Sequence, residues 1–141
     1  MVKLSRQEKK EIVEAIRCAE MHTSGQIRVH LKDRCGENVL EEAKKIFTRL
    51  GMHRTKEHSA VLIFVAPASR RFAIVGDSGI HARAGQDFWH HSRDAMAQSL
   101  AQGRLKEAIL TGIGQAAEEL KKYFPAKPAS GNELSDKVTE N

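Results

Sequence analysis

The segment 60–66, with the sequence AVLIFVA, constrains the fold of this chain more than any other feature because it is apolar at every position. A strand with one face in water alternates apolar and polar residues, whereas a strand covered on both faces is apolar throughout. The segment is also much shorter than the roughly 20 residues that a helix needs to cross a bilayer. We therefore predict a buried central strand with a further layer of structure packed on each of its faces.

Two other strands are predicted beside this central strand. Residues 26–31 alternate, with Arg28 and His30 on the polar side, which is typical of a strand that has one face in water and lies at a sheet edge. Residues 71–76 are mainly apolar and follow the central strand after a short turn. Such a short connection makes consecutive strands antiparallel neighbours.

Helical periodicity of the apolar residues predicts about four helices around the sheet. Ser5 and Glu8 form a capping-box pair at the start of the first helix, and Gly51 is expected to end the second in a left-handed conformation. The second helix connects two strands, and such a βαβ unit is right-handed and parallel in nearly all proteins. The predicted helices span residues 6–21, 39–50, 86–101 and 104–124.

Together these elements predict a three-layer α/β/α domain. Its small mixed sheet has the strand order 1-2-3, with strands one and two parallel and strand three antiparallel, and the helices flank it on both sides. A chain of 141 residues fits one domain. We assign residues 1–125 to this domain and predict an extended C-terminal tail for residues 126–141, which contain Pro128, Ser130 and Gly131.

The charge and composition of the chain indicate what kind of partner it binds. A net charge of +5 favours anionic partners. The basic residues are spread along the whole chain, and a single Trp and a single Tyr offer little surface for stacking on bases, so we do not expect nucleic acid as the partner. We predict an unidentified soluble protein or an anionic ligand instead.

The N-terminal segment and the cysteines predict a cytoplasmic protein without a membrane anchor. Residues 1–10 are charged and lack the apolar stretch of a secretory signal. No other segment is long and apolar enough to span a bilayer. Cys18 and Cys35 form neither a disulfide framework nor a CxxC pair, as expected for a reducing compartment.

The predicted topology brings three polar loops to one edge of the sheet. Strands one and two start at this edge and the reversed third strand ends there, so the loops 22–26, 53–59 and 77–81 converge. Free backbone N–H groups, small residues and the carboxylate of Asp77 suit an anion or a bound cation. The binding residues that we predict there are Thr23, Ser24, Gly25, Arg54, Thr55, Gly79 and His81.

A purely structural interpretation of the same residues stays open. Gly25 and Gly79 are also the residues that a tight turn with positive φ requires. Thr23 and Ser24 have the residue types of turns and helix caps, and an Asp such as Asp77 often accepts hydrogen bonds from its own turn.

Three segments of the chain follow distinctive motifs. Residues 16–30 (IRCAEMHTSGQIRVH) contain a helix end of the form A-E-x-x-T-S-G that leads into a strand. Residues 50–55 follow the pattern L-G-M-x-x-T, and residues 72–81 follow F-A-I-x-G-D-x-G-I. With these blocks, and with FW at 88–89 and FP at 124–125, the chain resembles the TPM domain family, in particular its small cytosolic branch with a single domain.

This family is named after a thylakoid-lumen acid phosphatase, a photosystem-II repair protein and an auxiliary protein of an acetylcholine receptor. The resemblance implies a three-layer α/β domain, a phosphatase activity and, as in some members, binding of divalent cations. Functions this different mean that family membership does not settle the function. The chain also departs from the family pattern, since Gln26 stands where many relatives carry Glu, and residues 58–60 (HSA) replace an expected R-N-G.

The three polar loops, which together form a rim at this edge of the sheet, allow two functions. A calcium or magnesium ion held by Asp77, with Glu20 and Gln26 as further ligands, would need water and loop carbonyls to complete its roughly six to eight oxygen ligands. The first function is a non-catalytic binding domain with this divalent-cation site at the rim. The alternative is a weak cation-dependent phosphatase for phosphomonoesters, with Asp77 as the catalytic residue.

We favour the binding domain because the chain lacks the sequence signatures of phosphatase chemistry. No Cys-x5-Arg loop follows either cysteine, and no Asp-x-Asp motif accompanies Asp77. Nucleotide and organic cofactors are not expected either. The only loose GxGxxA pattern, at residues 112–117, lies inside a predicted helix and follows no strand, so its glycines are predicted to allow close helix packing.

Overall fold

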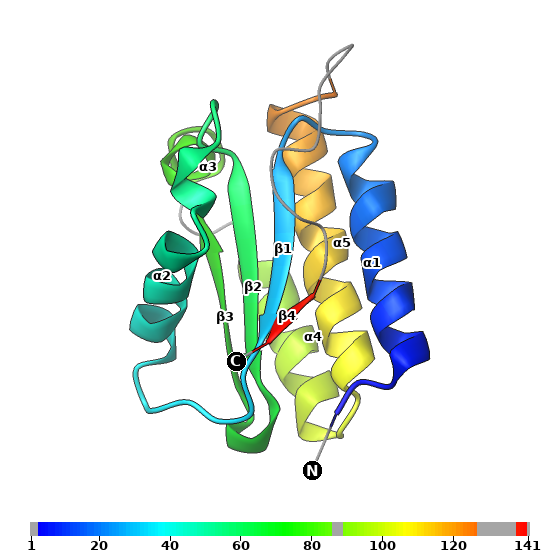
Figure 1. Ribbon diagram of the computed structural model, residues 1–141. Helices are drawn as coiled ribbons and strands as arrows, with labels where there is room; N and C mark the ends of the chain where they lie inside the picture. Colours follow the sequence, from blue (N-terminus) through cyan, green and yellow to red (C-terminus); the bar gives the residue numbers. More distant parts are fainter. Residues whose placement is uncertain (1–2, 86–88, 127–137, 141) are drawn as a thin grey trace.

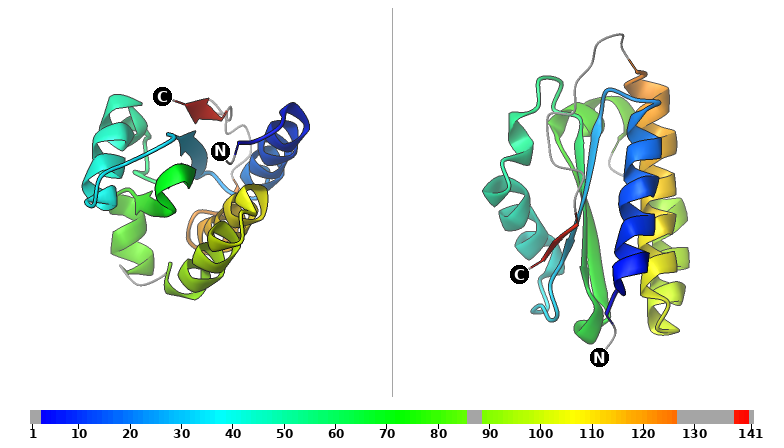
Figure 2. Two further views of the ribbon diagram at one scale, coloured as in Figure 1. Left: turned by 90° about the horizontal axis from the view of Figure 1, so that it is seen from below. Right: turned by 45° about the vertical axis from the view of Figure 1, so that its right-hand side comes forward.

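The computed structural model describes residues 3–85, 89–126 and 138–140. In chain order its helices and strands are α1 (Arg6–Glu20), β1 (Gln26–Leu31), α2 (Val39–Arg49), β2 (Ala60–Ala66), β3 (Arg71–Gly76), α3 (Ser78–Ala84), α4 (His90–Ala101), α5 (Leu105–Tyr123) and β4 (Thr139–Glu140), with short 3-10 helices at Met52–Arg54 and Pro67–Ser69. They form three layers around a central sheet (Figure 1). Helix α2 lies on one face of the sheet, while α1, α4 and α5 lie on the other, as Figure 2 also shows.

The sheet has the strand order β3-β2-β1-β4. β1 and β2 are parallel, with Gln26 beside Ala60 where both strands begin, and β3 runs antiparallel to β2, with Gly76 beside Val61. The predicted three-layer fold and the strand order 1-2-3 are therefore confirmed. The short β4 adds a fourth strand, parallel to the outer side of β1 near its end.

β2 is buried at every position, as its apolar sequence predicts. Val61, Ile63 and Val65 belong to the core on the side of α1, α4 and α5. Leu62 and Phe64 belong to a second core on the side of α2. Successive side chains of a strand point to opposite faces, so a central strand with helices on both faces needs an apolar residue at each position.

The face of β1 that carries His30 is buried at this residue, whereas the sequence predicts that it lies in water. The sequence predicts His30 on a face in water, but its side chain is only 1% exposed. Its ring stacks on Phe64, with 6.1 Å between the ring centroids, and its Nδ1 lies 2.6 Å from the Thr139 Oγ1. The prediction of a wet face at a sheet edge is therefore wrong at this point, because β4 covers it. Residues 127–137 and 141 of the predicted tail lie outside the described residues.

The segment after β3 also differs from the prediction. Residues 77–81 are predicted as a loop, yet Ser78–Ala84 forms the helix α3. Asp77 caps this helix, since its Oδ1 accepts the N–H of Ser78 at 2.7 Å. Gly85, with a φ of +82°, follows the last turn. The side chain of His81 therefore projects from a short helix and not from a loop.

The other helix ends follow the prediction more closely. Ser5 Oγ accepts the N–H of Glu8 at 3.0 Å, and Glu8 Oε1 accepts the N–H of Ser5 at 2.9 Å, which confirms the capping box. Gly51 has a φ of +73°, the left-handed conformation predicted for it. Helix α4 begins at His90, later than the predicted helix 86–101, and residues 86–88 lie outside the described residues.

Candidate functional site

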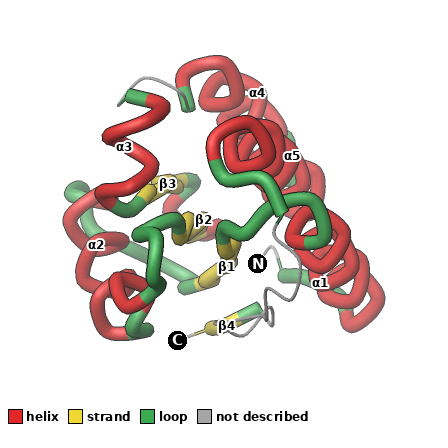
Figure 3. The backbone as a smooth tube through the Cα atoms, turned by 90° about the horizontal axis from the view of Figure 1, so that it is seen from above, coloured by secondary structure: helices red, strands yellow, loops and turns green. Residues whose placement is uncertain are grey.

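The three loops that are predicted to converge do lie at the same end of the sheet, which Figure 3 shows from above. Ser24 Oγ donates to Glu57 Oε1 at 2.8 Å, and His58 Nδ1 lies 3.3 Å from Asp77 Oδ2, so side chains link each loop to the next. We call this end of the molecule the rim. It comprises residues 22–26, 53–59 and 77–81.

Thr23 connects the first rim segment to the end of α5 through hydrogen bonds. Its side chain is 2% exposed, and its Oγ1 accepts the N–H of Gly25 at 3.0 Å and donates to the carbonyl of Phe124. The N–H of Ser24 donates to the same carbonyl at 2.9 Å. Because the Thr23 hydroxyl is buried and bonded on both sides, its role in the fold is structural.

Replacing Thr23 with valine is expected to lower the free energy of unfolding by about 1–3 kcal/mol. Valine has the same shape but leaves the buried N–H of Gly25 without its acceptor. Urea denaturation of the purified variant measures the loss. Thr111→Val is the matched control, since the Thr111 hydroxyl bonds only within its own exposed helix turn, and a loss at Thr23 no larger than at Thr111 would contradict the structural role.

Gly25 and Gly79 are glycines for a reason that differs from the positive φ of the purely structural interpretation. Neither has a positive φ in this structure. Instead, other parts of the chain approach them too closely for a side chain. A Cβ at Gly79 would lie 2.2 Å from the carbonyl oxygen of Glu57, and one at Gly25 would lie 2.7 Å from Leu120 Cδ2. These two glycines therefore allow the rim segments to pack directly against each other and against α5.

Three further predicted binding residues differ in how exposed their side chains are, namely Thr55, Arg54 and His81. Thr55 is 4% exposed, and its Oγ1 accepts the N–H of Ser59 at 3.3 Å, so this hydroxyl stabilises the loop before β2. Arg54 and His81 are exposed. Of these three predicted binding residues, only Arg54 and His81 thus present their side chains to solvent.

Asp77 has two local partners. Its carboxylate caps α3 through the N–H of Ser78, and its second oxygen faces the imidazole of His58. The Asp77 side chain is 14% exposed and the His58 side chain is 54% exposed, so the pair borders solvent. His58 has a φ of +51°, a left-handed conformation that is uncommon outside glycine and that marks a constrained loop.

The other predicted metal ligands, Glu20 and Gln26, do not present free side chains on the rim surface as a metal site would need. The Glu20 Oε2 accepts the N–H of Ile27 at 2.9 Å and so satisfies the start of β1. The Gln26 side chain is 4% exposed and lies below the surface. The described part of the chain contains no group of three or more His, Cys, Asp or Glu side chains that could hold a metal ion.

Two rim residues were not among the predicted binding residues, although they contact those that were. Glu57 bonds Ser24, and His58 faces Asp77. Both lie in the loop 53–59 that the topology places on the rim. Their position just before the central strand is the only feature of the sequence that indicates a place in the site.

The fold and the rim define a small three-layer α/β/α domain whose polar segments meet at one end of a mixed sheet. A family model described as TPM domain matches residues 3–119. The chain therefore belongs to the TPM domain family, as its sequence motifs predict.

Several solved structures are similar to this chain. The NMR structure of the BA42 protein from the psychrophilic bacterium Bizionia argentinensis is 40% identical, with a TM-score of 0.89, and the match covers 98% of this chain and 95% of that one. The N-terminal domain of a protein from P. gingivalis shares the fold at 14% identity and a TM-score of 0.70, covering 86% of this chain and 78% of that one.

The N-terminal domain of the cg2496 protein from Corynebacterium glutamicum also shares the fold, at 14% identity and a TM-score of 0.57, with 99% of this chain and 82% of that one covered. A search of curated proteins gave no match. Among the described residues, no helix has the length and apolar character that crossing a membrane requires.

Proposed function

We propose that this protein is a non-catalytic binding domain that takes a divalent cation, calcium or magnesium, at the rim. The observation that carries the proposal is the placement of two carboxylates on adjoining rim segments, Asp77 before α3 and Glu57 before β2. Glu57 and His58 pack with their backbone carbonyls against Gly79, two residues after Asp77. Carboxylate and carbonyl oxygens are the ligands that both cations prefer.

The proposed site is a weak one. Calcium takes roughly six to eight oxygen ligands, and the two carboxylates with the nearby carbonyls supply only part of that number. The Glu20 carboxylate accepts a hydrogen bond from the backbone of Ile27 in β1 and is therefore not a ligand of the proposed site. The main protein ligands are the carboxylates of Asp77, which the sequence predicts, and of Glu57. Water completes the coordination, and sites of this kind bind calcium at about 1 mM.

The bonding of the rim threonines and the placement of the two cysteines favour binding over nucleophilic catalysis, and the exception is Ser24, whose hydroxyl donates to the Glu57 carboxylate at 2.8 Å. Nucleophilic catalysis needs a hydroxyl or thiol next to a base. The hydroxyls of Thr23 and Thr55 are buried and bonded to the backbone. Cys18 is exposed on α1, and Cys35 lies beside Ser69 at the opposite end of the sheet, where burial raises the pKa of its thiol and so disfavours the thiolate.

Titration of the isotope-labelled protein with calcium and then magnesium is expected to shift the backbone amides of the rim saturably, with a midpoint of about 1 mM. Asp77→Asn is expected to weaken binding at least about tenfold, because it removes a charged ligand while asparagine still caps a helix well. Asp94→Asn removes an exposed carboxylate from α4, away from the rim, and should leave the midpoint unchanged.

Three results would contradict the cation site. They are the absence of shifts at 20 mM metal, shifts spread over the whole surface, and equal midpoints for Asp77→Asn and the wild type. Because asparagine keeps the cap of α3, an unchanged spectrum away from the rim shows that the variant is folded.

The His58–Asp77 pair favours a second candidate function, a weak cation-dependent phosphatase for phosphomonoesters. A carboxylate that orients an imidazole is the arrangement of a general base. The test is hydrolysis of p-nitrophenyl phosphate with magnesium or calcium present. Turnover that disappears in both Asp77→Asn and His58→Gln, with both variants folded, would replace the non-catalytic assignment. Turnover that survives in either variant would come from a contaminant or from another site.

A further inference from the structure

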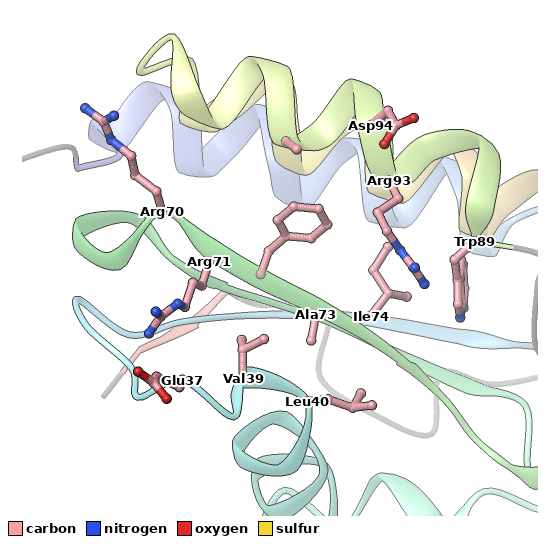
Figure 4. A pocket seen from close by; sticks show the side chains of 12 residues that line it. Glu37, Val39, Leu40, Arg70, Arg71, Ala73, Ile74, Trp89, Arg93 and Asp94 are labelled. Carbon is pink, nitrogen blue, oxygen red and sulfur yellow. The ribbon is translucent and has the colours of Figure 1, made fainter.

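A groove of about 580 Å³ runs along the outer edge of β3, between α2 and α4 (Figure 4). Its floor is apolar and contains Phe72, Ala73 and Ile74 of β3 itself. Arg70 and Arg71 lie at one end and Trp89 lies at the other. The groove is on the side of the sheet, separate from Asp77 and the other side chains of the proposed cation site.

The backbone of β3 is open toward this groove. β3 is the first strand of the sheet and pairs only with β2 among the described strands. The N–H of Asp77 donates to Ala60 of β2 at 3.0 Å, and hydrogen bonding alternates along an antiparallel pair. The N–H and C=O groups of Phe72 and Ile74 therefore point away from β2. No hydrogen bond within the described part of the chain satisfies them.

The two walls of the groove suit the alternating side chains of an added strand. Val39 and Leu40 of α2 form one wall, and Leu40 is a large apolar side chain that is 45% exposed. Trp89 and Ala97 line the other wall, on the side of α4. An extended peptide paired with β3 would direct successive side chains to these two walls in turn.

The charges around the groove indicate what kind of peptide it accepts. Three arginines, Arg70, Arg71 and Arg93, line it against two carboxylates, Glu37 and Asp94, so the lining carries a net positive charge. None of the three arginines forms an ion pair within the described residues. Figure 4 shows Arg93 reaching down from α4 toward Ile74, whereas the carboxylate of Asp94 points away. Guanidinium groups bind carboxylates with two parallel hydrogen bonds.

We propose that the β3 edge binds an extended acidic segment of a partner protein as an additional strand. The backbone of Phe72 and Ile74 pairs with the segment, Arg93 on the α4 wall binds its carboxylates, and its apolar side chains cover Leu40 on the α2 wall. A second copy of this chain is a poor occupant, because two such grooves face to face would bring their arginines together. The inference goes beyond the cation-binding function and does not depend on it.

An array of capped peptides tests this proposal directly. Each peptide alternates valine with a second residue, which is Glu, Gln or Lys. The protein is expected to bind the Glu peptides, to bind the Gln peptides at least about tenfold more weakly and to show no binding to the Lys peptides. Binding of the Glu peptides should weaken as the salt concentration rises. In amide spectra, the bound Glu peptide should slow solvent exchange of the Phe72 and Ile74 N–H groups.

Variants of groove residues test whether the peptides bind at the β3 edge. Arg93→Glu should weaken binding of the Glu peptides at least about tenfold and more than Arg71→Glu does, because an alternating peptide with valine over Leu40 directs every Glu side chain to the α4 wall. Arg104→Glu makes the same charge change at an exposed position before α5 and should have no effect. Ile74→Pro removes the outward N–H, which edge strands tolerate, and should abolish binding. If that variant does not fold, the arginine variants still decide the question.

Four results would overturn the proposal. They are no binding of Glu peptides at 1 mM, equal binding of Gln and Glu peptides, exchange protection located away from β3, and a dimer in solution that pairs through β3. In the first two cases the arginines would serve only to keep an open sheet edge from pairing with other chains. Since the cation titration reports on Asp77 and the rim, failure of one experiment leaves the other unaffected.

Discussion

Replacing Gly79 with alanine is expected to destabilise the protein by about 3 kcal/mol, more than most single substitutions. The new Cβ would lie 2.2 Å from the carbonyl oxygen of Glu57 and 2.6 Å from that of His58. Both atoms belong to the backbone, so no side chain can rotate to make room. The loop before β2 has to move away from α3, which separates the two segments that carry the proposed cation ligands.

Two measurements check this expectation. Thermal unfolding should show a fall in Tm of about 10 °C, and the cation titration of any folded fraction should show weaker binding. Gly114→Ala is the matched control, because a Cβ there meets nothing within 4 Å in an exposed part of α5. Alanine favours a helix over glycine by about 1 kcal/mol, so this variant should be slightly more stable than the wild type. Equal stability of Gly79→Ala and the wild type would contradict the close packing of the rim segments.

The main sheet could be predicted from the sequence because its pattern is local. The uninterrupted apolar run of β2, the alternation in β1 and the short turn before β3 determine the strand order without any long-range information. β4 could not be predicted in this way. It is two residues long, too short to show a pattern, and its contact between His30 and Thr139 spans 109 positions of the chain.

Helix α3 was missed because its sequence favours a turn. Asp77, Ser78 and Gly79 are typical turn residues, and glycine is a poor helix former. Two tertiary features decide the conformation instead. The carboxylate of Asp77 caps the helix, and Ile80, which is 1% exposed, packs into the core below it.

The position of the candidate site could be predicted, but the roles of its residues could not. Topology alone brings the three segments to one rim. Thr23 and Thr55 have the residue type of ligand-binding side chains, and only their burial and hydrogen bonds show that they hold the backbone. Glu57 and His58 belong to no motif, so their contacts with Ser24 and Asp77 become visible only in three dimensions.

Replacing Phe64 with alanine is expected to have the largest effect, a loss of about 3–5 kcal/mol in the free energy of unfolding. Phe64 lies on the central strand, its side chain is 0% exposed, and it forms part of the core on the side of α2. Its ring also supports the imidazole of His30, whose Nδ1 contacts Thr139. The substitution therefore leaves a cavity in the core and also removes the support beneath the contact that joins β1 to β4.

Urea denaturation measures the loss of stability, and the imidazole NMR signals of His30 report on its contact with Thr139. Phe64→Leu is the control, since leucine fills most of the space and should cost roughly 1–1.5 kcal/mol. It removes the aromatic stack as well, so a change in the His30 signals in both variants, with a large loss of stability only in Phe64→Ala, separates the stacking from the cavity. A loss below about 1 kcal/mol for Phe64→Ala would contradict a tightly packed core between β2 and α2, because an unfilled cavity of this size destabilises a packed core by more than that.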